Sequence, residues 1–364
     1  MQELTSCESP SGDVAALVRC ADLLTGWGNA ALGRNASRIV RAGLPHLLWP
    51  APDPAVLLLG HFDTVWPVGT LAEWPVTVHD GVARGPGVFD MKAGIVQMLT
   101  AAELAAGVDR VSVVLTCDEE TGSRTSRDLI EEEARQAGAV LVCEPSADGG
   151  AVKVARKGCA GYQLRVTGRA AHAGLEPELG VNAAVELAHQ VLELEHLASP
   201  AEGTTVTPTV LAAGTTANTV PESAVMQVDV RGWTREELDR VDATIRQVAP
   251  RLPGAAVRVD GGVNRYPLEA EMAQPLLEVL RLAAQDVGLP APDAVRSGGG
   301  SDGNLTAGIG VPTLDGLGAV GEHPHARTEW VDVRAMPDRA ALLAAMIDRI
   351  CTAGDDDARV ARMR

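Results

Sequence analysis

The sequence is poor in aromatic side chains and in basic charge. Aromatic residues make up only 3% of the 364 residues, so we expect hydrophobic cores built from alanine, valine and leucine. Lysine and arginine number 31 against 48 aspartates and glutamates, which gives a net charge of −17. Such a chain repels polyanions on average, and no basic stripe interrupts the pattern. The composition therefore disfavours nucleic-acid binding.

Long apolar runs and paired cysteines are also missing. No stretch of about 18 apolar residues occurs, so no membrane-spanning helix is predicted. Residues 1–5 have neither the basic start nor the apolar core of a signal peptide. The six cysteines are dispersed without a Cys-x-x-Cys pair, so we expect reduced thiols in a cytoplasmic protein rather than a disulfide framework.

Apolar runs and helical patterns alternate along the first 158 residues. Residues 56–59, 111–116 and 139–142 are short apolar runs that predict buried strands, and residues 93–104 and 129–136 have helical spacing. This alternation predicts an α/β sheet with helices on both faces. Open sheets of this kind bind their ligands at the carboxyl ends of the strands.

A different rhythm occupies residues 159–268. Half-solvated strand patterns alternate with helical ones, at 161–166, 181–197, 204–211, 224–230, 234–248 (with Thr234 as the expected N-cap) and 255–259. This order is that of a ferredoxin-like α+β unit. A helix at 276–284 and a strand at 311–314 resume the α/β pattern. We therefore predict a catalytic domain of residues 1–158 and 269–364, interrupted by an inserted domain of residues 159–268, with residues 355–357 as a solvated tail.

Histidines and carboxylates gather where the predicted strands and turns end. The set comprises His61, Asp63, Asp90, Glu119, Glu120, Glu144 and His325. Imidazole and carboxylate suit Zn²⁺, and several carboxylates facing two histidines suit a pair of ions about 3.5–4 Å apart that share one carboxylate. Asp63, two residues after His61, is placed to hydrogen-bond the ligand imidazole. Taken alone, each of these motifs is equally compatible with a solvated strand end that has no function. The clustering of all of them favours a metal site.

Five blocks of the sequence resemble the signature blocks of the dinuclear zinc aminoacylase/carboxypeptidase family (metallopeptidase family 20), and within it the carboxypeptidase-G (glucarpidase, glutamate carboxypeptidase) branch. The blocks are Gly60-His61-Phe62-Asp63-Thr64-Val65, Gly87-x-x-Asp90-Met91-Lys92-Ala93-Gly94, Asp118-Glu119-Glu120-x-Gly122-Ser123, Cys143-Glu144-Pro145-Ser146 and His325-Ala326-x-x-Glu329-Trp330-Val331. The likeness runs from Glu8 to Trp330. It implies a three-layer zinc-exopeptidase-like catalytic domain, with the inserted ferredoxin-like domain acting as a lid and as the dimerisation domain of a homodimer.

The resemblance also implies roles for the clustered residues. His61 and Glu144 would hold one zinc ion, Glu120 and His325 the other, and Asp90 both, with Co²⁺ as an expected substitute. Glu119 would be the general base, and Asp63 would support catalysis beside it. We expect the carboxylates of residues 119 and 120 to point in different directions because they are adjacent on an extended segment.

The C-terminal block contains a second candidate ligand. His323 precedes His325 by two residues, and Pro324 between them separates the directions of the two rings. The family pattern of a histidine followed by glutamate and an aromatic residue favours His325, which has Glu329-Trp330 after it.

Five further residues resemble the family's substrate-binding groups. His172 resembles the histidine that reaches into the active site of the partner subunit and stabilises the oxyanion. Asn218 and Arg231 resemble residues that hold the substrate carboxylate, for which the planar fork of arginine is suited. Arg296 and Gly299 resemble a glycine-rich loop whose backbone approaches the substrate. Without the resemblance, that loop is better interpreted as a turn.

These observations favour a zinc hydrolase that cleaves an amide or peptide bond next to a free carboxylate. The substrate stays open between a C-terminal glutamate conjugate, an N-acyl amino acid and a dipeptide. A catalytically silent scaffold is disfavoured because Glu119 and the full ligand set are intact. A serine hydrolase is disfavoured as well, since no serine nucleophile elbow is expected.

Overall fold

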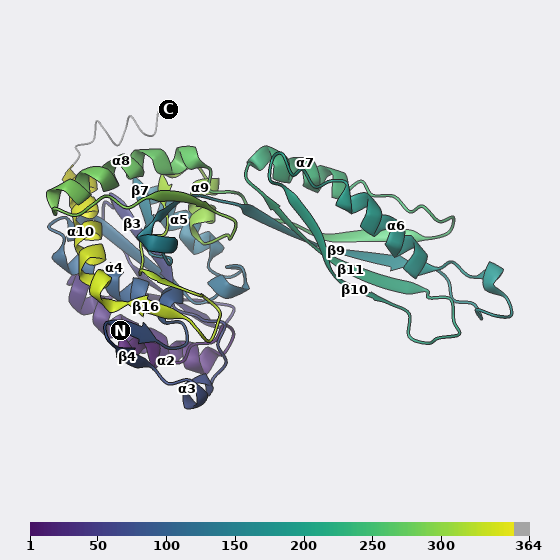
Figure 1. Ribbon diagram of the computed structural model, residues 1–364, viewed down its shortest axis with the longest axis horizontal. Coiled ribbons are helices and arrows are strands. Elements are labelled where there is room, and N and C mark those ends of the chain that lie inside the picture. Colours follow the sequence, from purple (N-terminus) through teal and green to yellow (C-terminus); the bar gives the residue numbers. More distant parts are fainter. Residues whose placement is uncertain (353–364) are drawn as a thin grey trace. The chain divides into compact units, whose positions relative to one another are not determined.

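The computed structural model describes residues 1–352, so the predicted tail at residues 355–357 lies outside the described residues. The chain forms two compact units (Figure 1). The first consists of Met1–Arg156, Leu268–Ser297 and the chain from Ser301 onward, and the second of Lys157–Pro267 with Gly298–Gly300. Within residues 1–352, none of the helices combines the length and the apolar character needed to span a bilayer. The predicted cytoplasmic location stays a prediction.

The first unit is built on a six-stranded sheet with the order β1-β2-β6-β3-β7-β14. Its strands are β1 (Ser37–Arg41), β2 (Leu44–Trp49), β3 (Val56–His61), β6 (Val111–Thr116), β7 (Ala139–Val142) and β14 (Thr313–Leu314). Strands β6, β3, β7 and β14 run parallel, whereas β1 and β2 form an antiparallel edge. The predicted strands at 111–116 and 139–142 are confirmed.

Helices pack on both faces of this sheet and make three layers (Figure 1). One face is covered by α2 (Val14–Leu32), α4 (Ala93–Leu104), α8 (Ala270–Asp286) and α10 (Met336–Thr352), and the other by α5 (Arg127–Gln136) and α9 (Gly303–Gly308). Strand β3 connects the two cores, because Val56 and Leu58 point to one and Leu57 and Leu59 to the other. The predicted α/β class is confirmed.

Short elements around the sheet frame the loops that carry the candidate residues. They are the helices α1 (Gln2–Thr5) and α3 (Thr70–Glu73), the sheet of β4 (Thr77–His79), β5 (Val82–Arg84), β15 (Gly321–Glu322) and β16 (Trp330–Asp332), and the parallel pair of β8 (Val152–Arg156) and β13 (Ala294–Ser297). His325 lies between β15 and β16, and Asp90 lies in the turn η1 (Val88–Lys92). Strands of two or three residues have no detectable period, so the sequence did not predict this small sheet.

The second unit is an antiparallel sheet in the order β10-β11-β9-β12, with α6 and α7 packed on one face (Figure 1). Its elements are β9 (Gly158–Thr167), α6 (Ala183–Glu195), β10 (Thr205–Ala213), β11 (Ser223–Gly232), α7 (Arg235–Ile245) and β12 (Ala256–Arg265). This is the predicted strand–helix–strand–strand–helix–strand order. The hydroxyl of Thr234 accepts the backbone N–H of Glu237, so the predicted N-cap is confirmed.

Candidate metal centre

His61 is the last residue of β3, and the chain after it turns back to hold its imidazole. The residue is 1% exposed. Its Nδ1 lies 3.1 Å from the carbonyl oxygen of Asp63 and 3.4 Å from Oδ1 of the same residue. The nearest acceptor is thus the backbone carbonyl rather than the carboxylate that the sequence suggested. Either acceptor keeps the proton on Nδ1 and leaves the lone pair of Nε2 available for a metal.

The buried Asp63 carboxylate fixes the backbone of the next motif. Its Oδ1 accepts the N–H of Glu119 and its Oδ2 the N–H of Glu120, both at 3.2 Å, and Oδ2 also accepts the Ser11 hydroxyl at 2.7 Å. Two consecutive N–H groups converge on one carboxylate, which requires a tight turn. Asp63 therefore acts on Glu119 and Glu120 as well as on the histidine.

The segment Glu119–Thr121 is a 3₁₀ turn, η3, and not the extended segment that we expected. Gly122 ends it with φ of 90°, a conformation that glycine adopts without steric cost. At three residues per turn, successive side chains differ in direction by roughly 120°. Glu119 and Glu120 consequently still point in different directions, for a different geometric reason from the one predicted.

Asp90 lies between the two predicted ligand histidines. Its Oδ1 is 3.2 Å from Nε2 of His61, and its Oδ2 is 3.3 Å from Nε2 of His325. Oε1 of Glu144 lies 3.4 Å from Nε2 of His61, and Oε1 of Glu120 lies 3.1 Å from Nε2 of His325. The five predicted ligands thus form two histidine–glutamate pairs that share one aspartate.

The structure separates the two histidines of the C-terminal block. Both have positive φ, 64° for His323 and 61° for His325, which is uncommon for residues other than glycine. His323 points to solvent, where its nearest charged neighbour is Glu322 at 3.8 Å. Only His325 contacts Asp90 and Glu120.

The charges of the cluster show what kind of ion fits it. Contacts with Asp90 and then Glu120 raise the pKa of His325 to about 10. Burial alone would lower the pKa of His61, but its contacts with Asp63, Asp90 and Glu144 outweigh burial and raise it. The surrounding carboxylates thus favour positive charge at both rings. A divalent cation supplies positive charge at the same place and would displace ring protons, as metals do at imidazole ligands.

The donor atoms are close enough to share ions. One ligand atom from each of His61, Asp90 and Glu120 lies within 4.8 Å of the others, and the same holds for His61, Glu119 and Glu144. Nitrogen and carboxylate oxygen donors in this mixture fit Zn²⁺. The residues present therefore fit the predicted pair of ions.

Glu329 holds the loop of Asp90 through hydrogen bonds to its backbone, a role that the sequence did not predict. Its buried carboxylate accepts the backbone N–H groups of Gly87 at 3.1 Å, Phe89 at 2.7 Å and Asp90 at 3.0 Å, and the indole N–H of Trp66 at 3.2 Å. Burial raises the pKa of Glu329 to about 7, although these donors oppose the rise. The Asp90–Met91 peptide bond that follows is cis.

Arg156, buried at the end of β8, is a second residue beside the site that the sequence did not predict. It contacts Asp315 and Glu144. The available signal was a charged residue that ends an otherwise buried strand, since a buried arginine requires a partner.

In the second unit, the structure brings His172 and Asn218 together. His172 pairs with Thr219, and the carbonyl of Asn218 accepts the N–H of the residue that follows His172 at 2.9 Å. Nδ1 of the exposed His172 ring accepts the N–H groups of Gly174 and Leu175, both at 3.1 Å. The ring proton therefore sits on Nε2, which is free to donate a hydrogen bond to an oxyanion.

Arg231 has a partner of its own in this structure. Its Nε lies 2.9 Å from Oδ1 of Asp229, and its Nη2 lies 2.9 Å from Oδ2. This side-chain contact raises the pKa of Arg231. An arginine has five N–H donors, so the pairing leaves donors for a substrate carboxylate but reduces the net charge that the carboxylate meets.

The two groups of substrate-binding candidates lie at opposite ends of the second unit. Arg231 is near the end of β11, whereas Ser223 begins the same strand eight residues earlier and pairs with Thr167. At about 3.3 Å per residue, the two ends of the strand are roughly 26 Å apart. His172 and Asn218 lie beyond the Thr167 end, so one chain's inserted unit does not bring them next to Arg231.

The remaining loop candidates stay predictions. Arg296 lies in β13, and Gly299 belongs to residues 298–300, which group with the second unit. Contrary to the expectation of no nucleophile elbow, Gly299-Gly300-Ser301-Asp302-Gly303 does have the Gly-x-Ser-x-Gly spacing. The structure nonetheless excludes an exposed serine nucleophile there, because Ser301 is fully buried and its hydroxyl donates to Asp315.

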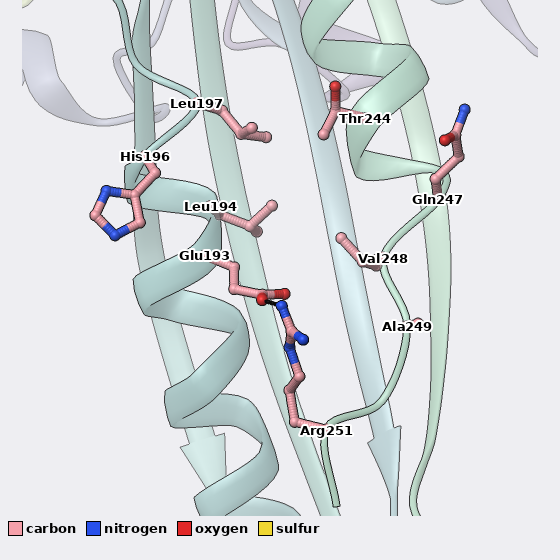
Figure 2. Close-up of a pocket in the computed structure, with 9 residues that line it drawn as sticks. All are labelled: Glu193, Leu194, His196, Leu197, Thr244, Gln247, Val248, Ala249 and Arg251. Carbon is pink, nitrogen blue, oxygen red and sulfur yellow. Dashed lines mark ion pairs between the residues drawn. The ribbon is translucent and has the colours of Figure 1, made fainter.

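The second unit also has an open groove of about 490 Å³ between α6 and α7 (Figure 2). Leu194, Leu197 and Val248 line it, and an ion pair joins Glu193 to Arg251 (Figure 2). None of the residues that line the groove is among the candidates named above.

A three-layer α/β unit with paired histidines and carboxylates at the carboxyl ends of its strands has the architecture of a metal-dependent hydrolase. The chain belongs to peptidase family M20/M25/M40, which it matches over residues 57–349. It is therefore an enzyme that hydrolyses peptide or amide bonds with the help of metal.

Individual relatives agree with this assignment. The chain is 32% identical to Carboxypeptidase G2 of Pseudomonas sp. (strain RS-16), over 95% of this chain and 87% of that protein. It is 27% identical to Succinyl-diaminopimelate desuccinylase 2 of Shewanella loihica, over 88% and 92%. The solved structure of the Bacillus subtilis YXEP protein, a dinuclear metal binding peptidase from the M20 family, shares the fold, with a TM-score of 0.68, 14% identity and 96% coverage of both chains.

Proposed function

We propose that the protein is a dinuclear zinc hydrolase that releases a C-terminal glutamate, or a similar amino acid, from an amide or peptide conjugate with a free α-carboxylate. The observation that carries the proposal is the placement of Asp90, whose two oxygens face His61 and His325 separately. Similarity to Carboxypeptidase G2 supports a carboxypeptidase, and the resemblance to the glutamate carboxypeptidase branch supports the choice of glutamate. Similarity to a desuccinylase favours the second candidate, an N-acyl-amino-acid deacylase.

In this proposal His61 and Glu144 would hold one zinc ion, Glu120 and His325 would hold the other, and Asp90 would contact both. When bound, zinc supplies positive charge that lowers the pKa of the attacking water toward about 7. Glu119, whose carboxylate lies close to His61 and Glu144, accepts the proton of that water and passes it to the leaving amine.

We further propose a homodimer formed through the inserted unit, with two composite active sites. His172 and Asn218 lie at one end of β11 and Arg231 at the other, so they do not meet in one chain's unit. If His172 of the partner subunit reaches the oxyanion, then Asn218 of the partner subunit comes with it. Arg231 then holds the substrate carboxylate from the same chain as Glu119.

Metal removal tests the proposed function. Dialysis against a chelator is expected to abolish activity, and Zn²⁺ or Co²⁺ is expected to restore it, with up to two ions per chain by elemental analysis. His325→Ala should lose one of the ions, whereas its matched control His323→Ala should keep both. Full activity in protein shown to be free of metal would contradict the whole proposal.

A substrate panel separates the two candidate activities. Folyl-type glutamate conjugates, N-acetyl and N-succinyl amino acids and simple dipeptides are compared by their kcat/KM values. We expect the glutamate conjugates to have the highest value. A preference for the N-acyl amino acids would support the deacylase instead, with the same metal centre.

Recognition of the substrate carboxylate gives a separate prediction for Arg231. Arg231→Ala should lower kcat/KM by about 30-fold, which corresponds to a loss of about 2 kcal/mol in transition-state stabilisation. This is the lower end of the range for truncating one partner of a charge pair, because Asp229 already neutralises part of the charge. Arg231→Lys should recover only part of the loss. The matched control is Arg258→Ala, which breaks a similar pair with Asp260 two residues along β12 and should leave kcat/KM unchanged.

A double-mutant cycle shows whether Arg231 contacts that carboxylate. An amidated substrate should be poor with the wild-type enzyme but little worse with Arg231→Ala, because both changes remove the same contact. Simple addition of the two losses would instead make Arg296 the better candidate.

A further inference from the structure

A buried arginine lies directly behind one half of the metal centre. Arg156 is 3% exposed, and its Nε and Nη2 lie 2.7 and 3.1 Å from the two carboxylate oxygens of Asp315. The same Nη2 lies 3.8 Å from Oε2 of Glu144. The other oxygen of Glu144 faces His61. The Glu144 carboxylate is thus placed between a candidate metal position and a permanent positive charge.

The Arg156–Asp315 pair is held firmly on the side away from the metal centre. Asp315 is fully buried and also accepts the hydroxyl of Ser301 and the N–H of Gly316. Buried ion pairs contribute little net stability compared with apolar packing of the same volume. A contribution of this pair to the neighbouring site is therefore a better explanation than stability alone.

The backbone around Glu144 is held by bonds to other residues: its carbonyl accepts the N–H of Gly318 at 2.9 Å, and the N–H of Cys143 donates to Leu59 at 3.1 Å. What Arg156 adds to Glu144 is therefore mainly charge.

The other half of the centre has no equivalent of this arginine. Glu120 faces His325 at 3.1 Å, and within residues 1–352 no lysine or arginine lies at ion-pair distance from its carboxylate. The two glutamate ligands, otherwise similar, thus differ in the charge behind them.

We propose that Arg156 acts on the metal centre electrostatically, through Glu144, and that its charge makes the His61–Glu144 half the weaker of the two cation positions. The guanidinium attracts electron density and negative charge of Glu144 that would otherwise bind the cation. It also repels the cation directly, over a short distance and through a medium of low dielectric. This inference rests on the two-metal centre proposed above.

The test measures zinc affinity in each half separately, by competition with a chromophoric chelator, and so needs no turnover. His325→Ala leaves the His61–Glu144 half intact, and His61→Ala leaves the Glu120–His325 half. Into each background we introduce Arg156→Met together with Asp315→Leu, which removes the buried pair without leaving one charge unpaired. Thermal unfolding checks that each variant is folded.

The expected change in zinc affinity is opposite in direction to the change that a purely structural role of Arg156 would cause. The double substitution should tighten zinc binding at least tenfold in the His325→Ala background and change it less than threefold in the His61→Ala background. Weaker binding in the first background would mean that the pair holds Glu144 in place, and equal changes in both would mean a general effect on the fold. Either outcome overturns the proposal.

A second variant keeps the test decisive if the double substitution does not fold. Asp315→Asn retains Arg156 but removes its neutralising partner, so zinc binding in the His325→Ala background should become several-fold weaker. Unchanged binding would overturn the inference. A wild-type protein that binds no zinc would instead contradict the proposed function, and one that binds two ions but shows no effect of these substitutions would contradict only the role of Arg156.

Discussion

Replacing Glu119 by glutamine is expected to lower kcat by roughly 10²–10⁴-fold, the usual contribution of a general base, while both metal positions stay occupied. Glutamine has nearly the same shape as glutamate but cannot accept the proton of the attacking water. The turn that carries residue 119 is fixed by its backbone N–H and by that of Glu120, both bound to Asp63. The substitution should therefore leave the turn and the ligand Glu120 in place.

Two neighbouring carboxylates serve as controls for this result. Asp118 bonds to Thr125 and Ser126, so Asp118→Asn should lower the unfolding temperature but not the kcat of the folded enzyme. Glu120→Gln should lose metal as well as turnover. The measurements are kcat at saturating zinc and the metal content of each variant. A Glu119→Gln variant that keeps kcat within tenfold of wild type would mean that another group is the base.

The second large effect is expected at His172. His172→Ala should lower kcat by about 10²–10³-fold, as the loss of one oxyanion donor does in other hydrolases. The geometry supports this role, since Gly174 and Leu175 donate to Nδ1 and leave the proton on Nε2. His189→Ala, which changes an exposed histidine of α6, is the matched control and should retain full activity.

Subunit mixing shows in which chain His172 acts. Inactive His172→Ala chains mixed with inactive Glu119→Gln chains should regain about a quarter of wild-type activity, because half of randomly exchanged dimers carry one intact composite site. Asn218→Ala should complement Glu119→Gln in the same way. Arg231→Ala should not, since we place Arg231 and Glu119 of one chain in the same site.

No recovery after verified exchange of subunits would place His172 in its own chain's site. Recovery with Arg231→Ala would mean that Arg231 serves the partner subunit's site instead. The experiment thus tests the proposed dimer together with the assignment of the two ends of β11 to different active sites.

The elements that could be predicted best are those with a long and regular pattern. Strands 111–116 and 139–142 and the helix at 93–104 have the predicted bounds. Buried parallel strands are continuous apolar runs, and the helix is an apolar segment too long to be one of them. The segment Glu119–Thr121 was wrongly predicted as extended, since its turn depends on Asp63, more than 50 residues earlier in the chain. The sheet that frames His325 and Asp90 was missed because its strands are too short to show a period.

The sequence by itself determined that His61 and Glu144 lie at the same edge of the sheet. His61 and Glu144 come at or just after the ends of parallel strands, and those ends necessarily share one edge of the sheet. Only the tertiary structure decided that each oxygen of Asp90 faces a different histidine. One of them is His325, which the resemblance favoured over His323.

Glu329 and Arg156 are residues whose contacts the sequence could not predict. Glu329 fixes the backbone of Phe89 across 240 positions, and Arg156 meets Asp315 across 159. Local spacing carries no information about contacts at such separations. They exist only because the packed layers bring distant loops together, and there a buried charge must find a partner.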